Sequence, residues 1–142
     1  MKDTRYGIGV EIGLPYEAAV ERTIDALKQE GFGVLTTIDV KQTLKQKLDK
    51  DFRKYTILGA CNPPLAYRAF QADVEIGLLL PCNVVVHETD VPGRSSVLAI
   101  APLVAIGMVS GQAALMEVAR EADASLRRAL RALEAAHAGT GS

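Results

Sequence analysis

The fold class follows from residues 82–101, which read CNVVVHETDVPGRSSVLAIA. Residues 82–88 are rich in β-branched side chains and predict a strand. Residues 90–93 (DVPG) have the composition of a tight turn, and residues 95–101 are predicted to return as a second strand. Strands joined by a tight turn are antiparallel, so an all-parallel sheet is excluded.

Further strands and helices are predicted on both sides of this hairpin. Residues 6–12 alternate apolar with small or charged side chains, which indicates a half-buried strand. Apolar side chains recur every three or four residues from Tyr16 onward and again over residues 113–136, which indicates two amphipathic helices. The other predicted elements are strand 32–38, a short helix capped by Asp39, strand 54–61, and a short helix that Asn62-Pro63-Pro64 opens and that runs through Asp73.

This element order defines an α+β fold: strand, helix, four strands and a long C-terminal helix, with two short helices inserted. The antiparallel sheet is expected to be covered on one face by helices, and the C-terminal helix, about 36 Å long, is expected to lie across it. Phe70 of the second short helix is expected to point inward. One domain over residues 1–138 and a flexible tail over 139–142 are predicted. The core stripe predicted for the long helix is Leu115, Val118, Ala122, Leu126, Leu130 and Leu133.

Composition and charge argue against several classes of function. The 142 residues include 16 Lys and Arg and 17 Asp and Glu, so the net charge of −1 does not favour nucleic acid or an anionic membrane as a partner. The aromatic content of 5% is too low for a base-stacking platform. No apolar run reaches the roughly 18–20 residues of a membrane span, and no signal-peptide pattern follows Met1. We therefore expect a cytoplasmic protein in which the two cysteines remain thiols.

Two cysteine-containing segments form the candidate site. Cys61-Asn62-Pro63 ends one predicted strand and Pro81-Cys82-Asn83 begins the next, so both segments are expected at the same rim of the sheet. Two thiols and two amides at one rim could bind a small ligand or a soft metal ion. The predicted ligand-binding residues are Cys61, Asn62, Pro63, Pro81, Cys82 and Asn83, with Cys61 and Cys82 as the candidate metal ligands.

Three interpretations of this rim remain open. It is a binding module for a small ligand or soft metal, a thiol-dependent redox protein or enzyme that uses Cys61 and Cys82, or a non-catalytic scaffold whose cysteines are core residues. Two cysteines are too few for a four-ligand zinc site in one chain, so a two-thiolate Cu(I)-type site is the better metal candidate. His87 is five strand residues beyond Cys82, roughly 16–17 Å away and on the opposite face, which disfavours a Cys–His pair. No catalytic residue and no cofactor is assigned.

Other features give weaker signals. The nearly uncharged segment 97–108 predicts a homodimer interface, unless the long helix covers it. Glu75 is expected to point outward from a connector, although a desolvated position with a raised pKa is the alternative. A basic run is interpreted as a solvated helix face, because no glycine-rich phosphate loop accompanies it; its residues are Lys41, Lys45, Lys47, Lys50, Arg53 and Lys54.

Two central segments resemble a bacterial family known as domain of unknown function 302. They are residues 55–69 (YTILGACNPPLAYRA) and 75–86 (EIGLLLPCNVVV), and the resemblance extends over about residues 5–135. It implies an α+β unit similar to the TATA-binding protein, often seen as a dimer, with no established activity. The family's cysteine, asparagine and proline positions map onto the six rim residues. The resemblance implies an acidic residue before the proline that follows the last strand, whereas this chain has Ala101 before Pro102.

Overall fold

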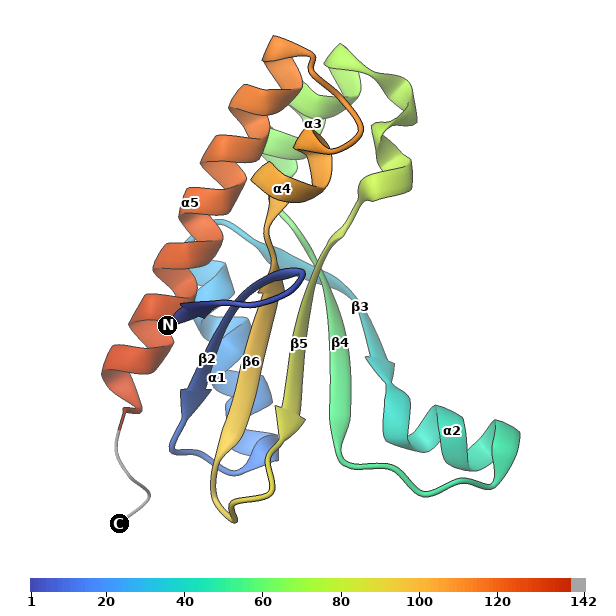
Figure 1. The fold of residues 1–142 in the computed structure, drawn as a ribbon, viewed down its shortest axis with the longest axis vertical. Coiled ribbons are helices and arrows are strands. Elements are labelled where there is room, and N and C mark those ends of the chain that lie inside the picture. Colours follow the sequence, from blue (N-terminus) through green and yellow to red (C-terminus); the bar gives the residue numbers. More distant parts are fainter. Residues whose placement is uncertain (139–142) are drawn as a thin grey trace.

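Figure 1 shows the fold in a computed structural model, which describes residues 1–138. The tail predicted over 139–142 lies outside the described residues. The strands are β1 (Lys2–Asp3), β2 (Gly7–Ile12), β3 (Gly33–Asp39), β4 (Tyr55–Cys61), β5 (Cys82–Glu88) and β6 (Ser95–Ile100). The helices are α1 (Tyr16–Gln29), α2 (Val40–Leu48), α3 (Pro63–Ala72), the 3₁₀ helix η1 (Val74–Leu79), α4 (Pro102–Gly107) and α5 (Ala113–Ala136).

The strands form one open antiparallel sheet in the order β1-β2-β6-β5-β4-β3. The predicted hairpin lies in its centre, with Val86 of β5 opposite Val97 of β6. Gly93 in the turn has a φ of 77°, a left-handed conformation that glycine adopts at little cost. The fold-class prediction is confirmed.

Helices α1 and α5 cover one face of the sheet (Figure 1). Alternation along the strands directs apolar side chains toward them, and the core includes Ile8, Ile12, Leu58, Val84 and Val86. Among the described residues, no helix packs on the opposite face of the sheet. All six residues predicted for the core stripe of the long helix are buried: Leu115, Val118, Ala122, Leu126, Leu130 and Leu133.

Helix α5 has the predicted bounds but not the predicted placement. Its C-terminal half packs against α1 and β2, while its N-terminal half continues past the end of the sheet (Figure 1). There it packs against α3 and α4, forming with η1 a second layer at the end of the sheet that we call the helical end. The helix expected to lie across the sheet therefore covers it only with its C-terminal half, because its apolar stripe is shared between the sheet and these short helices.

Several local elements were not predicted. Strand β1 adds a sixth, edge strand beside β2, and α4 forms between β6 and α5, where no helix was predicted. The segment before β5 is the helix η1, capped by Asp73, whose side chain accepts a hydrogen bond from the N–H of Glu75 at 3.0 Å. The expectation of two inserted helices was thus too low.

Helix α2 is formed as predicted, but none of its side chains is buried. Asp39 caps it by accepting a hydrogen bond from the N–H of Gln42 at 2.9 Å. None of its residues is buried, and Leu48 is 62% exposed. Figure 1 shows α2 projecting from the end of β3 at the side of the molecule. The solvated helix face predicted for its lysines agrees with this position.

Candidate functional site

The two cysteines come together at the helical end. Cys82 is directly opposite Ala60 in the pairing of β4 with β5, and Cys61 follows Ala60. Both cysteines are partly exposed free thiols and both line one cavity of about 260 Å³. The cavity lies where the sheet ends and the short helices begin.

The walls of this cavity come from seven elements, several of them distant in sequence. The ends of β4 and β5 form the floor, and β3, α3, η1, α4 and α5 contribute the remaining sides. Four facing positions are alanines, namely Ala66 and Ala69 of α3 and Ala119 and Ala122 of α5. Alanine side chains do not reach far enough to fill the space between two helices, which leaves the cavity open between them.

Among the described residues that line the cavity, Asn62 is the only one with an amide side chain. It caps α3, because its Oδ1 accepts a hydrogen bond from the N–H of Leu65 at 3.3 Å. The following Pro63 and Pro64 occupy the first helical positions, where a missing N–H costs nothing. The local sequence therefore both ends β4 and turns the chain to form one wall of the cavity.

Burial makes both thiols weaker acids than an exposed cysteine. It raises the pKa of Cys61, and it raises the pKa of Cys82 to about 11, with the neighbouring Cys61 as a smaller second cause. Both thiols are therefore protonated near neutral pH. The nucleophile in cysteine chemistry is the thiolate, so this environment disfavours the thiol-enzyme interpretation.

The structure brings together four of the six predicted ligand-binding residues. Cys61, Asn62, Pro81 and Cys82 line the cavity. Pro63 is exposed on the first turn of α3, and Asn83 is exposed on β5 opposite Gly59, so neither belongs to the wall. Strand alternation explains the second case, because Asn83 points to the face opposite that of Cys82.

A metal centre at this cavity would depend on the thiols of Cys61 and Cys82. Within residues 1–138 the structure contains no group of three or more His, Cys, Asp or Glu side chains arranged to hold a metal ion. His87 lies at the other end of β5 from Cys82, as predicted.

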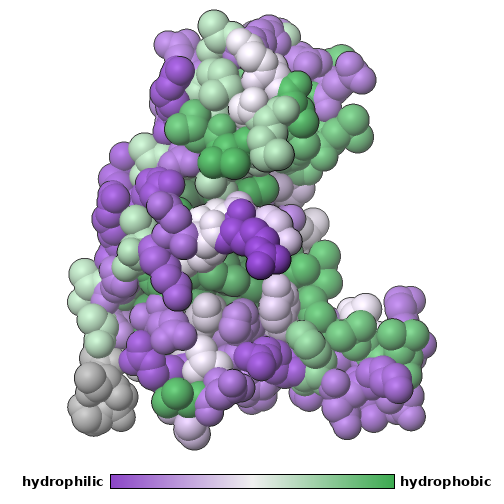
Figure 2. Space-filling view, in the orientation of Figure 1, coloured by the Kyte–Doolittle hydropathy of each residue, from purple (hydrophilic) through white to green (hydrophobic). Residues whose placement is uncertain are grey.

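Exposed apolar side chains surround the helical end. Figure 2 shows hydrophobic residues gathered on the surface over α4 and η1. Val74 and Leu78 of η1 are 81% and 85% exposed, and Met108 after α4 is 80% exposed. Phe70, which was expected to point inward, lines the cavity but remains 44% exposed. Glu75 is exposed as predicted.

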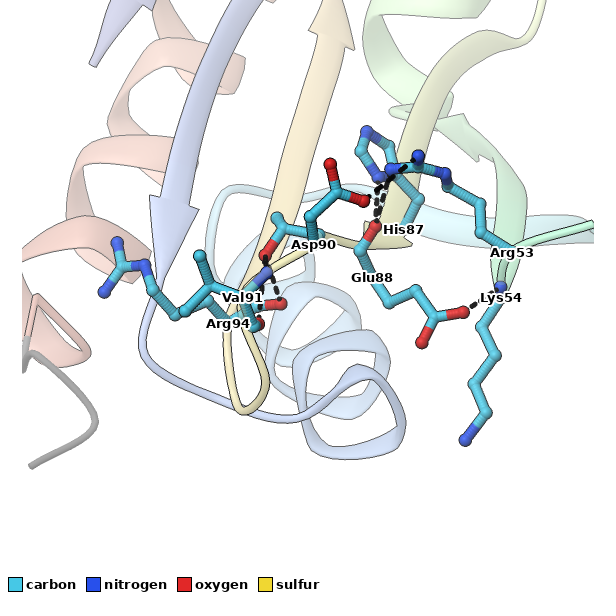
Figure 3. Close-up of polar contacts among 8 residues, drawn as sticks. Arg53, Lys54, His87, Glu88, Asp90, Val91 and Arg94 are labelled. Atoms are coloured by element: carbon cyan, nitrogen blue, oxygen red, sulfur yellow. Dashed lines mark hydrogen bonds and ion pairs between the residues drawn. The ribbon is translucent and has the colours of Figure 1, made fainter.

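A polar cluster occupies the opposite end of the sheet (Figure 3). The N–H of Lys54 donates to Glu88 Oε2 at 2.6 Å, and Arg53 donates to the backbone oxygen of Glu88 at 3.3 Å and to Asp90 at 3.5 Å. His87 stacks on Tyr55 with ring centroids 5.4 Å apart, and its Nδ1 lies 2.7 Å from the backbone oxygen of Glu88. These contacts tie the β5–β6 turn to the start of β4, which is a structural role.

Sequence reasoning missed most of the cavity wall. It assigned Val118 and Ala122 to a filled core, and it did not expect α4, whose Ile106 lines the cavity. The sequence feature that could have indicated the cavity is a pair of alanines three residues apart on each of two helices. This feature indicates a cavity only when the two helices are known to face each other.

Fold and site together define a class: an α+β protein with one open antiparallel sheet and a small apolar cavity between the end of the sheet and a layer of helices. The family model for the domain of unknown function DUF302 matches residues 8–133. The chain is also similar to a crystal structure of an uncharacterized conserved DUF302 protein from Bacillus stearothermophilus, with 30% identity and a TM-score of 0.82. That similarity covers 92% of this chain and 99% of the other. The chain belongs to the DUF302 family, as its central segments indicated.

A comparison with curated proteins gives no match. Among the described residues, no helix is both long and apolar enough to cross a membrane.

Proposed function

We propose that this protein is a binding module for a small apolar molecule, which occupies the cavity between β4, β5, α3 and α5. The observation that carries the proposal is the chemistry of the wall. Apart from Asn62 and the two thiols, the lining side chains are hydrocarbon, and apolar surface removed from water drives binding in such a pocket.

The size of the cavity supports a small ligand. A buried apolar cavity of about 150 Å³ accommodates benzene, and drug-sized ligands occupy pockets of about 300 Å³ or more. The cavity of about 260 Å³ lies between these values. A ligand of about ten non-hydrogen atoms therefore fits, in proportion to benzene.

Binding of indole, a neutral compound of suitable size, tests the proposal. In ¹H–¹⁵N NMR spectra, indole is expected to shift the amide signals of Gly77 and Ala119 saturably. Ala66→Leu places a larger side chain in the cavity from a half-buried position and is expected to weaken binding at least tenfold. Ala124→Leu makes the same change at an exposed position of α5 and serves as the control. Unchanged spectra, or equal binding by both variants, would refute the proposal.

A soft metal bound by Cys61 and Cys82 is the second candidate, supported by the adjacency of two unpaired thiols on neighbouring strands. Cu(I) accepts two thiolate ligands, and binding would release their protons. Titration with Cu(I) under anaerobic conditions would test it. Cys61→Ala and Cys82→Ala should each abolish stoichiometric binding, whereas equal uptake by either variant would exclude the site.

Three further expectations remain proposals of the same kind. We propose a cytoplasmic location, which the two unpaired thiols support, since reducing compartments preserve them. We also propose a homodimer and a single domain over residues 1–138. The continuous hydrophobic core supports the single domain.

A further inference from the structure

We propose that the cavity selects an electrically neutral ligand and excludes both anions and cations of the same size. This inference rests on the proposed function, because it concerns the ligand of that same cavity. It is carried by the absence of charged side chains from the wall, together with the position of the one amide.

Within the described part of the chain, none of the residues that line the cavity is an Asp, Glu, Lys, Arg or His. The charges of the neighbouring helices are directed elsewhere. Arg68 of α3 pairs with Glu121 of α5 at 2.6 Å on the exposed surface. Asp123 of α5 pairs with Arg127 at 2.6 Å and accepts a hydrogen bond from the N–H of Leu103 at the start of α4. An ionised ligand in the cavity would therefore lose its hydration without gaining an opposite charge.

The surroundings of Cys82 show what a charged ligand would meet in the cavity. Apart from Cys61 and Asn62, the other lining residues are apolar. A carboxylate placed beside this thiol would meet the same apolar surroundings.

Asn62 provides a place for one polar group of a neutral ligand. Its Oδ1 is occupied by the N–H of Leu65, while its Nδ2 makes no hydrogen bond within residues 1–138. The Nδ2 group lies next to Gly31. Glycine has no Cβ atom, and a Cβ atom at this position would be only 3.0 Å from Nδ2. A hydroxyl or carbonyl oxygen on the ligand can accept a hydrogen bond from this amide.

Three compounds with one ring and different charges test the inference: benzyl alcohol, benzoate and benzylammonium. Their dissociation constants are measured at pH 7 by NMR titration of the native chain, following Gly77 and Ala119. Benzyl alcohol is expected to bind at least tenfold more tightly than either ion. The inference is overturned if either ion binds as tightly as the alcohol, including the case in which none of the three binds. Indole binding separates this failure from failure of the cavity itself, since indole would still bind if only the selection by charge were wrong.

A charge placed at the amide position provides a second test. Asn62→Asp keeps the oxygen that caps α3 and adds a carboxylate at the cavity, so benzylammonium is expected to bind at least fivefold more tightly than it does to the native chain. Asn83→Asp makes the same substitution at an exposed position outside the wall and should change nothing. An unchanged affinity in Asn62→Asp, or an equal gain in Asn83→Asp, would contradict the inference.

Discussion

At the scale of single residues, Cys82 connects the cavity with the stability of the fold. The folded chain holds the pKa of this thiol at about 11, whereas its ordinary value is 9.0. Folding therefore favours the protonated thiol. Stability falls with pH wherever the native state binds more protons than the unfolded state, which for Cys82 is the range between these two values.

The free energy of unfolding is expected to decrease as the pH rises from 8 to 11. Below pH 9 the raised pKa of Cys82 stabilises the folded chain by about 2 kcal/mol, and this stabilisation is lost as the pH rises toward 11. Denaturant unfolding at pH 8 and at pH 11 gives the free energy of unfolding of the native chain and of Cys82→Ala. The difference between the two chains is expected to change between these pH values by the loss attributable to Cys82. Cys61→Ala is the matched control, since burial also raises the pKa of this neighbouring thiol but less strongly than that of Cys82. A difference that stays constant with pH would show that the Cys82 thiol is not buried in the folded chain.

At the scale of elements, α5 and α2 show how the same sequence pattern leads to different packing. Both helices carry apolar side chains at helical spacing. Ten residues of α5 are buried, including Leu126 and Leu130, which are fully inaccessible. Helix α2 has no buried residue, because it extends from the edge strand β3 and packs mainly against β3 and β4 at the side of the sheet.

Truncations in the two helices are expected to differ strongly. Leu126→Ala or Leu130→Ala should destabilise the chain by about 2–5 kcal/mol through lost burial and the cavity left behind. Leu48→Ala in α2 should cost less than about 0.5 kcal/mol. Urea unfolding measures all three. Losses under about 1 kcal/mol at both α5 positions would contradict the packing of that helix. A large loss at Leu48 would mean that another surface covers α2.

At the scale of the whole molecule, segment 97–108 has two different environments. Val97, Ala99 and Ile106 belong to the core of the chain itself, being at most 5% exposed. Val104 and Met108 are 56% and 80% exposed on the helical end. Only the second group is available to a partner, so Ile106→Glu would disrupt the core and is not a test of association.

Met108→Glu is the substitution suited to testing the dimer. Sedimentation at micromolar concentration should give a species of twice 15.2 kDa for the native chain and a single 15.2 kDa species for the variant. Val91→Glu, at an exposed position in the turn at the other end of the sheet, should leave the dimer intact. A native chain that sediments as a monomer throughout rules out the dimer, and a dimer that withstands Met108→Glu has its interface elsewhere.

Local features of the sequence were sufficient for most of the elements. The bounds of α5 and β5, the caps at Asp39 and Asn62 and the turn before β6 were all predictable. Each depends on side-chain spacing or backbone preference within a few residues of the chain. The shared rim position of Cys61 and Cys82 was predictable for the same reason, since one strand ends and the next begins there.

The cavity depends on the tertiary structure, because it is the space left unfilled where elements far apart in the chain pack together. Ala66 and Ala119 lie on α3 and α5, and nothing in either helix alone indicates that they face each other. The extension of α5 beyond the sheet, the formation of α4 and the isolation of α2 have the same origin. Periodicity shows which side of a helix is apolar, but the packing partner of that side is chosen by the competition among all elements for burial.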